Sequence, residues 1–551
     1  MPDTTTSVLT QRNDNSRTGA YVQETQLNTS NVNTNLFGKL FEYHLDGHVY
    51  AQPLVVSNID MPDGNTHNVV YIATMHNTVY AFDADNQLAA NSPLWTKSLG
   101  PSVGLPDANI GRTHQGQPIF NGAPVYGDIA HEVGILSTPV ISLSHNAIYV
   151  VAATKEGNTY SHRLHALDLA TRAEKFGGPT PIGSSTPGGN VTGPSVPGTG
   201  AGSVNGRVTF TSNRQIQRSA LLLANDTIYI AFAAYGDAGP YHGWVLAYNA
   251  TTLQRTAVYN TTPNGSGGGI WQGGQGPIAD SDGNIYFLTG NGSFDGNTQT
   301  ELGDSFVKLS PHLTLEDWFS PFNNAVLNKY DKDVGSSGAL LLPGTNLLVG
   351  GGKESKIYLI DKDHMDHFRA GGDSQIIQSF YINTPEPPGV FVNPNVQPPG
   401  DPLKTHHIHG APVCWDGPNG PCIYAWTEND NLKAYQFDGG KFQTAPLTKG
   451  STVSPGMPGG MLSVSANGNT AGTSIVWGSR PKANANRAVV PGVLHAYDAS
   501  DLTNELWNSE QNAQPQDAYN FAKFCSPTIA NGKVYMATFS GKVMVYGLIG
   551  Q

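Results

Sequence analysis

The sequence predicts an all-β fold, a single eight-bladed β-propeller of four-stranded antiparallel blades, on the basis of three observations. A short motif recurs eight times, each copy being one or two small or polar residues, then Pro or a small apolar residue, then a strand-like run. Most copies are followed by further strand-like segments rich in β-branched and aromatic residues. Turn-forming residues are abundant, with 64 Gly and 37 Pro, whereas charged residues are only 13% of the chain. Because one such repeat cannot bury its faces alone, the repeats must stack on their neighbours.

The motif copies mark where the innermost strand of each blade is expected to begin. They are Ala51–Leu54, Ser137–Val140, Arg218–Leu221, Gln275–Ile278, Ser337–Leu340, Gly410–Val413, Gly459–Leu462 and Cys525–Thr528. The unit Met457–Trp477 is the least regular, so a seven-bladed ring is the alternative.

The third strand of several units carries Ala-aromatic-Asp-Ala or a related pattern. Examples are Val79–Ala84, Leu164–Asp168, Val245–Ala250, Ile357–Asp361 and Leu494–Ala499, and a Trp follows in two units, at Trp95 and Trp507. The small residue lets neighbouring blades approach, the Asp forms a turn, and the Trp fills the seam between blades.

The last repeat, Lys533–Gly547, supplies only three strands. The segment Phe37–Gly47 resembles an outer strand such as Leu94–Gly100. We expect this N-terminal segment to pair with the C-terminal blade and close the ring, which removes the exposed edges of an open sheet.

Residues 1–551 are therefore expected to form one domain, interrupted by two long loops. Segment 183–206 is rich in Gly, Ser, Thr and Pro and has no periodicity, whereas segment 383–404 is rich in Pro and leads into His406–Gly410. Long loops inside a compact fold are usually functional lids or disordered connectors. The adjacent histidines favour a lid for the second loop.

Composition excludes several classes of partner and location. The net charge is -12 and no Lys/Arg-rich run is present, which argues against nucleic acid binding. No apolar run reaches the roughly 18 residues that a membrane span needs. The N-terminal residues do not resemble a signal peptide. The abundance of Asn, Thr and Gly suits a secreted or periplasmic protein whose signal is absent from this chain, and a cytoplasmic location stays open.

The three cysteines, Cys414, Cys422 and Cys525, show no CxxC or CxxCH spacing. A hairpin disulfide between Cys414 and Cys422 is one alternative. Buried free thiols are the favoured one, because Cys often serves as a small core residue.

In a propeller, residues at the starts of the innermost strands converge on one mouth of the axial channel. The sequence places there His48, Glu132, Arg214, Arg218, Trp271, Gln272, Asp333, His407, His409 and Lys523. The sharpest signal is His406-His407-Ile408-His409, because residues two apart on a strand face the same side. His407 and His409 can therefore share a divalent ion, calcium or a transition metal, with His48 as a third ligand. The alternative is that one histidine caps the strand and the others lie in solvent.

Common hydrolase signatures are absent from the sequence. There is no Gly-Lys-Ser/Thr phosphate loop, no Gly-x-Ser-x-Gly elbow and no His-Glu-x-x-His motif. Nucleotide hydrolysis and the common hydrolase chemistries therefore lose support.

The strand pairs, as in Val70–Thr74 followed by Thr78–Ala84, resemble the repeats of the pyrroloquinoline quinone (PQQ) propeller superfamily, and Gly532–Thr538 is similar. The resemblance covers nearly the whole chain. It implies an eight-bladed ring and, in the enzyme members, a PQQ near the axis that oxidises an alcohol or sugar and passes electrons onward.

The chain departs from those enzymes in three ways. It has no adjacent Cys-Cys pair, which alcohol-oxidising members place over the quinone, and no haem motif, so the electron acceptor is not specified. Sugar-oxidising relatives use a His base and Arg contacts, for which only the residue types of His407 or His409 and Arg218 match. Several superfamily members are scaffolds without a cofactor.

The leading hypothesis is a quinoprotein-like dehydrogenase that acts on an alcohol or sugar in the axial funnel. His407 or His409 would be the base, and Asp333 would orient the base or a cation. The expected cofactor-binding residues are Arg218 for a quinone carboxylate, Trp271 for stacking, Gln272 and Lys523.

Two alternatives come from other classes of protein. One is a metal-dependent lyase or hydrolase in which His48, His407 and His409 hold a divalent ion. The other is a non-catalytic binding propeller that uses the Pro-rich loop and the surface beside it for a partner.

Overall fold

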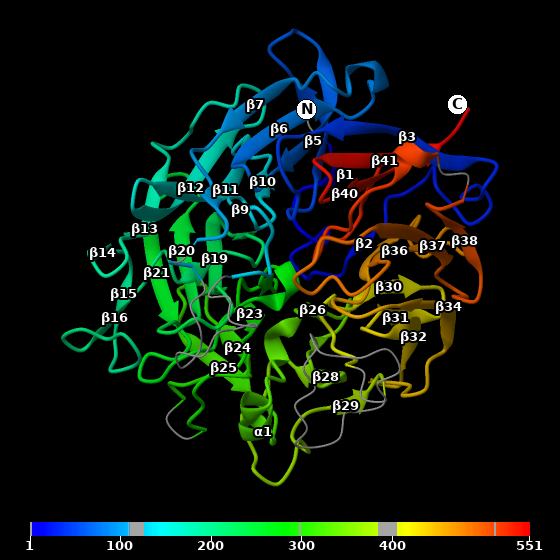
Figure 1. Cartoon of the computed structure of the whole chain (residues 1–551). Coiled ribbons are helices and arrows are strands. Elements are labelled where there is room, and N and C mark those ends of the chain that lie inside the picture. Colours follow the sequence, from blue (N-terminus) through cyan, green and yellow to red (C-terminus); the bar gives the residue numbers. More distant parts are fainter. Residues whose placement is uncertain are drawn as a thin grey trace.

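A computed structural model describes residues 3–107, 109–110, 126–296, 299–383, 405–511 and 514–550. Within these residues, eight blades follow one another around a ring, which confirms the eight-bladed propeller and excludes the seven-bladed alternative (Figure 1). In each blade the strands form an antiparallel meander, so the first strand runs away from one mouth of the channel and the second strand returns to it.

The first four blades contain the following strands. Blade 1 has β4 (Leu54–Asp60), β5 (Thr66–Ala73), β6 (Thr78–Asp83) and β7 (Trp95–Ser98). Blade 2 has β10 (Val140–Ser142), β11 (Ala147–Glu156), β12 (Thr159–Asp168) and β13 (Thr180–Ser185), with β14 (Val191–Thr192) outside. Blade 3 has β18 (Leu222–Ala224), β19 (Thr227–Ala234), β20 (Trp244–Asn249) and β21 (Arg255–Asn260), and β17 (Gln215–Ile216) also pairs with β19. Blade 4 has β22 (Ile278–Ala279), β23 (Ile285–Leu288), β24 (Phe306–Leu309) and β25 (Leu315–Phe319).

The other four blades complete the ring. Blade 5 has β26 (Ala339–Leu341), β27 (Leu347–Gly351), β28 (Lys356–Asp361) and β29 (Gln378–Tyr381). Blade 6 has β30 (Val413–Gly417), β31 (Gly420–Ala425), β32 (Asp430–Asp438), β33 (Lys441–Phe442) and β34 (Thr448–Ser454). Blade 7 has β35 (Met461–Ser465), β36 (Ile475–Pro481), β37 (Gly492–Asp498) and β38 (Glu505–Asn508). Blade 8 has β39 (Thr528–Ala530), β40 (Lys533–Ala537), β41 (Lys542–Leu548) and the N-terminal β3 (Phe37–His44).

Smaller elements connect the blades. They are the hairpin of β15 (Ser195–Pro197) with β16 (Arg207–Thr209), the pair β8 (Val103–Gly104) and β9 (Glu132–Val133), the helix α1 (Asn324–Lys329), and 3₁₀ turns at Gln87–Ala89, Gln272–Gly274, Val334–Ser336 and Pro515–Asp517. No helix in the described ranges is long and apolar enough to cross a membrane.

The recurring motif does mark the innermost strands. All eight of them begin within or directly after a motif copy. The Asp that ends the third strand forms the expected turn, because the carboxylate of Asp83, for example, accepts the backbone N–H groups of Asp85 and Asn86.

Buried tyrosines join neighbouring blades. A Tyr on a second strand donates its hydroxyl to a backbone carbonyl of the next blade, the pairs being Tyr71 with Leu169, Tyr149 with Ala250, Tyr229 with Pro311 and Tyr424 with Ala499. The indole N–H of Trp95 also donates to the Leu169 carbonyl, which confirms a Trp at this seam. Each bond satisfies a polar group that the seam would otherwise bury unpaired.

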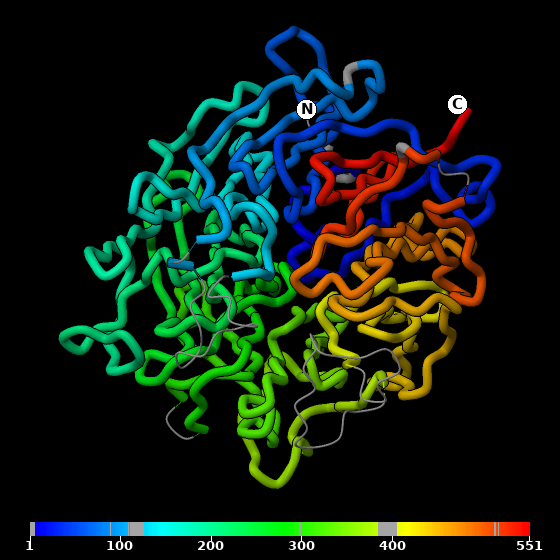
Figure 2. Tube along the Cα trace, in the orientation of Figure 1, coloured from blue at the N-terminus to red at the C-terminus, as the bar shows by residue number. Residues whose placement is uncertain are grey.

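The ring closes as the sequence predicted. Strand β3 pairs antiparallel with β41, so the N-terminal segment completes the C-terminal blade, and Figure 2 shows these two ends of the chain side by side. Tyr43 of β3 then donates its hydroxyl to the Asp83 carbonyl of blade 1, 2.8 Å away, which joins the last blade to the first.

Before β3, the chain runs through the channel and contacts the innermost strands. Strand β1 (Asp3–Val8) pairs with β4, and β2 (Ala20–Tyr21) pairs with β35. Between them, five backbone carbonyls accept N–H groups of the innermost strands. The pairs are Leu9 with Ile141, Asn15 with Ala279, Ser16 with Leu341, Thr18 with Cys414 and Gly19 with Val464. With the bond from Arg17 to Leu221 of blade 3 and that from the Tyr21 hydroxyl to Asn531 of blade 8, residues 3–21 contact all eight blades. We call residues 9–19 the axial segment.

Two fully buried arginines anchor the axial segment. Arg17 donates to the carbonyls of Pro277, Leu221 and Gln11, and Arg12 donates to the carbonyls of Ala411 and Pro412. Burial lowers the pKa of Arg12 to about 9 and that of Arg17 to about 10, so both guanidinium groups stay charged at neutral pH. Carbonyl oxygens from several blades therefore solvate two buried cations.

The two segments expected to be long loops differ in outcome. Segment 183–206 contains the end of β13 and the short strands β14 and β15, so it is not a loop throughout. Short strand pairs need only backbone hydrogen bonds, and they therefore tolerate a Gly- and Ser-rich sequence. The Pro-rich segment lies outside the described residues from position 384 to 404. The three cysteines are buried free thiols, and Cys414 and Cys422 belong to different core clusters on opposite faces of their sheet.

Deleting residues 1–45 should abolish cooperative unfolding, because the chain would lose both the axial segment and the outer strand of blade 8. Thermal unfolding followed by circular dichroism or calorimetry checks this. An unchanged, cooperative melt of the shortened protein would contradict ring closure by β3.

The substitution Arg17→Met should lower the free energy of unfolding by about 3 kcal/mol or more, because it leaves several buried carbonyls without a donor. Chemical denaturation measures the change. Arg172→Met is the matched control, because the Arg172 side chain is exposed and makes a single backbone bond. Equal stability of the two variants would contradict an anchoring role for Arg17.

Candidate metal centre

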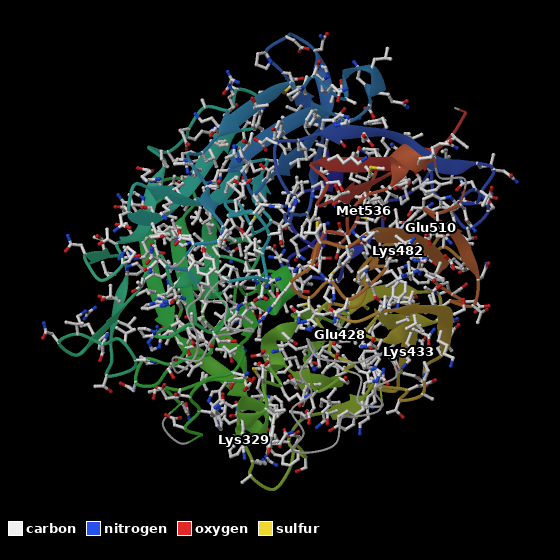
Figure 3. All side chains as sticks on the ribbon, in the orientation of Figure 1. Lys329, Glu428, Lys433, Lys482, Glu510 and Met536 are labelled. Carbon is white, nitrogen blue, oxygen red and sulfur yellow. The ribbon has the colours of Figure 1, made fainter. Side chains whose placement is uncertain are left out.

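Two histidines and one glutamate from blade 6 meet at the mouth of the axial channel. His407 and His409 lie in the extended segment that leads into β30, and Glu428 lies in the turn between β31 and β32. Figure 3 places Glu428 near the middle of the ring, whereas Lys433 of the same blade lies further out. The two histidines face the same side, as their spacing predicted, although the segment that carries them is not part of a strand.

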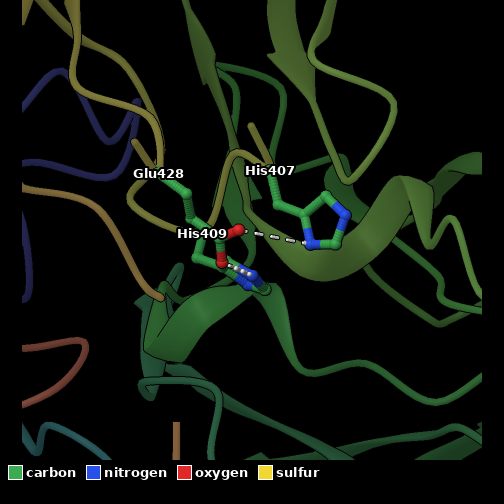
Figure 4. A group of neighbouring side chains, drawn as sticks. All are labelled: His407, His409 and Glu428. Carbon is green, nitrogen blue, oxygen red and sulfur yellow. Dashed lines mark ion pairs between the residues drawn. The ribbon is translucent and has the colours of Figure 1, made fainter. Parts of the chain in front are cut away.

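The three side chains form a compact set of metal-type donors (Figure 4). Their ligand atoms lie within 4.8 Å of one another. Glu428 Oε1 is 3.0 Å from His409 Nε2, and Glu428 Oε2 is 3.6 Å from His407 Nδ1. Two imidazoles and one carboxylate are a common ligand set of catalytic zinc and non-haem iron, and three ligands leave positions open for water or substrate.

Burial and neighbouring charges shift the pKa values of Glu428 and His409. Burial opposes ionisation of Glu428, but attraction to His407 and His409 outweighs it and lowers the pKa of Glu428 to about 2. Burial lowers the pKa of His409, although Glu428 opposes this shift. The Glu428 side chain is 0% exposed, and neither carboxylate oxygen accepts a well-aligned hydrogen bond from the described chain. A buried carboxylate in that state calls for a cation.

The backbone around the histidines is held by neighbouring blades. The Ser336 hydroxyl donates to the carbonyl of Ile408, 2.8 Å away. Gly273, at a φ of 56°, lies so close that an added Cβ would be 2.1 Å from the His409 carbonyl oxygen. His406 hydrogen-bonds the Glu428 carbonyl at 3.0 Å. The histidines are therefore fixed by contacts outside their own segment.

A buried lysine and a group of carboxylates lie beside this centre. Lys353 Nζ is 2.7 Å from Asp331 Oδ1 and also pairs with Asp333. Asp333, expected to orient a base or a cation, accepts the Asn291 N–H at 2.7 Å. Electrostatic interactions link Asp331 to His407 and Lys353 to His409. Asp333 is thus near the histidines, with Lys353 as its direct partner.

Two further aspartates near this group have raised pKa values. Burial, followed by the charges of Asp333 and Asp331, raises the pKa of Asp237 to about 7. Burial also raises the pKa of Asp304 well above its usual range. A pKa near neutral pH suits a general acid or base.

His48 does not join His407 and His409, so the expected third ligand needs correction. Its ring stacks on Phe539, with centroids 4.8 Å apart, and meets His131 edge-on at 4.9 Å. These groups line a separate cavity of about 320 Å³ with Glu132. The reason is that His48 precedes blade 1 whereas the other two precede blade 6, and Glu428 supplies the third donor from their own blade.

Trp271 lies close to Asp333. An added Cβ at Gly290 would be 2.8 Å from Trp271 Cζ3 and 2.6 Å from Asp333 Oδ1, so both side chains use the space that this glycine leaves. The Trp271 indole donates to the Ala234 carbonyl at 3.1 Å.

Gln272, expected to bind a cofactor, is engaged at both ends of its amide. It accepts the Leu288 N–H at 3.0 Å and donates to the Gln275 carbonyl at 3.1 Å. These bonds hold the corner of blade 4, which is a structural role.

Arg218 and Lys523 lie on the other side of the channel mouth. The Arg218 guanidinium is 3.8 Å from the centroid of the Phe524 ring, and that ring meets the His409 ring at a centroid distance of 6.2 Å. Lys523 donates to the Asp128 carbonyl at 2.8 Å. Both expected cofactor-binding cations therefore lie in the funnel.

Sequence reasoning missed Glu428 and Lys353. In an antiparallel meander, the turn after the second strand returns to the mouth where the first strand begins. Glu428 follows β31 and Lys353 follows β27, so both occupy such turns. Charged residues in the turns after the second strands were therefore the sequence signal that could have identified Glu428 and Lys353.

Comparison with known proteins identifies the fold. No family model matches the chain, and no curated protein matches its sequence. Among solved structures, a quinohemoprotein alcohol dehydrogenase from Pseudomonas putida matches with a TM-score of 0.57 and 13% identity, over 99% of this chain and 81% of that one. The quinohemoprotein alcohol dehydrogenase from Comamonas testosteroni matches with a TM-score of 0.52 and 14% identity, over 100% of this chain and 81% of that one. The chain thus shares its propeller fold with PQQ-dependent dehydrogenases.

Proposed function

We propose that this chain is a metal-dependent enzyme that holds a divalent transition-metal ion at His407, His409 and Glu428 and acts on a hydroxylated small molecule in the axial funnel. The observation that carries the proposal is the fully buried Glu428 carboxylate, which lies between two imidazoles so that the ligand atoms of His407, His409 and Glu428 are within 4.8 Å of one another. A buried carboxylate is costly to keep charged, and a bound cation offsets that cost.

A metal ion with open positions polarises an oxygen of the substrate or lowers the pKa of a water molecule. The chain's own residues supply the remaining chemistry. His407, His409 and Glu428 fix the position of the reacting oxygen. Lys353 stabilises negative charge, because despite burial Asp331 and Asp333 hold its pKa well above the usual range and keep it protonated. Asp237, with a pKa of about 7, exchanges protons with this group.

A PQQ-dependent alcohol or sugar dehydrogenase is the second candidate. The observation that favours it is the placement of the half-buried Trp271 beside Asp333 and Lys353, since an aromatic face and an acid–base pair suit a planar quinone and an alcohol. Trp271 would stack on the quinone, Arg218 and Lys523 would hold its carboxylates, and His407 or His409 would take the hydroxyl proton. PQQ accepts two electrons from the alcohol when it is bound. The three buried thiols are dispersed, so they supply no disulfide over the cofactor.

The protein should bind one equivalent of zinc or cobalt, measured by elemental analysis and isothermal titration calorimetry. Glu428→Gln and His409→Ala should each weaken binding by about 100-fold or more, because each removes a ligand. The exposed His364→Ala variant is the matched control and should bind normally. Adding PQQ in a parallel titration tests the second candidate through its absorption spectrum.

Each result of these titrations is decisive. Metal binding that all three variants retain equally would contradict the assigned centre. Stoichiometric PQQ binding without any metal dependence would favour the dehydrogenase, and binding of neither would favour a non-catalytic propeller.

Metal affinity should fall on acidification, because imidazoles must be neutral to bind a metal. An ordinary imidazole has a pKa of about 6.5, and burial lowers the pKa of His409. His409 is therefore expected to be mostly neutral at about pH 6.5, and its protonation should weaken binding only below that pH. Titrations of cobalt between pH 8 and pH 5 measure the profile, and a loss of binding already complete at pH 6.5 would contradict it.

A further inference from the structure

Three cations gather on the side of the channel mouth opposite the carboxylates. Arg218 precedes β18, Lys523 precedes β39, and Arg487 lies between β36 and β37. Asp128 is the carboxylate among them, and its Oδ1 lies 3.0 Å from Arg487 Nε. We call Arg218, Lys523 and Arg487 the basic patch.

Within the ranges that the structure describes, neither Lys523 nor Arg218 forms an ion pair with a carboxylate. Lys523 is only 4% exposed, and its Nζ has a backbone carbonyl as its hydrogen-bond acceptor. Arg218 is half-buried, its Nε is fully buried without a hydrogen-bond acceptor, and in the described part of the chain it forms no ion pair. Burial and the neighbouring arginines lower the pKa of Lys523 to about 8, although Asp128 opposes them. Buried cations without a counter-charge are unfavourable, and a bound anion removes that cost.

Phe524 lies beside both the basic patch and the metal centre. Its backbone has a φ of 65°, a left-handed conformation that is strained for a bulky residue. The Arg218 guanidinium lies 3.8 Å from the centroid of its ring, and the His409 ring meets it at a centroid distance of 6.2 Å. One phenyl ring therefore contacts a member of each group.

We propose that the axial site takes a substrate that carries a carboxylate, such as a hydroxy acid or a sugar acid. The carboxylate binds to Arg218, with Lys523 beside it, and the hydroxylated part extends over Phe524 to His407, His409 and Glu428. The guanidinium fork matches a carboxylate in two parallel hydrogen bonds. Glu428, Asp331 and Asp333 repel an anion, so the opposite orientation is disfavoured. This substrate class rests on the proposed function of the metal centre.

The test is calorimetric titration of the full chain with D-glucuronate, with D-glucose as the neutral probe and PQQ as the cofactor probe. Glucuronate should bind the metal-free protein and glucose should bind about tenfold more weakly or worse. Arg218→Gln should weaken glucuronate binding by about tenfold or more, and Arg218→Lys should retain part of it. Arg207→Gln is the control, because Arg207 lies on the exposed β15–β16 hairpin. Thermal unfolding confirms that each variant is folded.

Three results would overturn the proposal. They are equal affinity for glucose and glucuronate, glucuronate binding that Arg218→Gln leaves unchanged, and PQQ binding that depends on Arg218 while glucuronate does not bind. The last result would assign the basic patch to a cofactor carboxylate.

Metal stoichiometry and glucuronate binding, both measured on the unsubstituted protein, separate this proposal from the proposed function. If no metal binds while glucuronate binding still depends on Arg218, the metal centre fails and the carboxylate site stands. If metal binds normally while glucuronate does not bind at all, the carboxylate site fails and the metal centre stands.

Discussion

The arrangement depends on the axial segment, which places two charged arginines inside the channel of the propeller. Arg17 and Arg12 are solvated by carbonyls that the innermost strands of different blades contribute. The innermost strand of each blade is an edge of its sheet, so its main-chain N–H and C=O groups that face the axis would otherwise remain unpaired. The axial segment satisfies them and ties separate blades to one continuous peptide.

This segment also forms the floor of the candidate site. Arg12 holds the carbonyls of Ala411 and Pro412, which lie only two and three residues beyond His409. The histidines are thus fixed from below by the axial segment, from the side by Ser336 and Gly273, and across their own blade by Glu428. A site held from three directions can keep its metal-type geometry, although no strand hydrogen bonds hold the histidine segment itself.

The sequence predicted those features that depend on a repeat. Innermost strands, third-strand turns and the closing β3 were all found, because each repeats a pattern of small, turn-forming and β-branched residues. The shared direction of His407 and His409 followed from their spacing. The contact of these histidines with Glu428 did not follow from their spacing, because it depends on which turn of which blade faces the channel mouth. His48 was misplaced because the repeat gives residues of different blades the same height in the channel without bringing them together, and His48 precedes blade 1 whereas His407 and His409 precede blade 6. Arg12 and Arg17 follow no periodic pattern at all.

The charges of the funnel fall into two groups. Glu428 and the nearby aspartates come from blades 3 to 6 and their connections, whereas the basic patch comes from the connections that lead into blades 3 and 8 and from blade 7. Phe524 contacts a member of each group, because its ring lies against the Arg218 guanidinium and meets the His409 imidazole. Its backbone adopts a left-handed conformation that is strained for a bulky residue, as residues at functional sites often do. A group that binds anions and a group that binds cations therefore flank one phenyl ring, which is the arrangement that a ligand with two different ends requires.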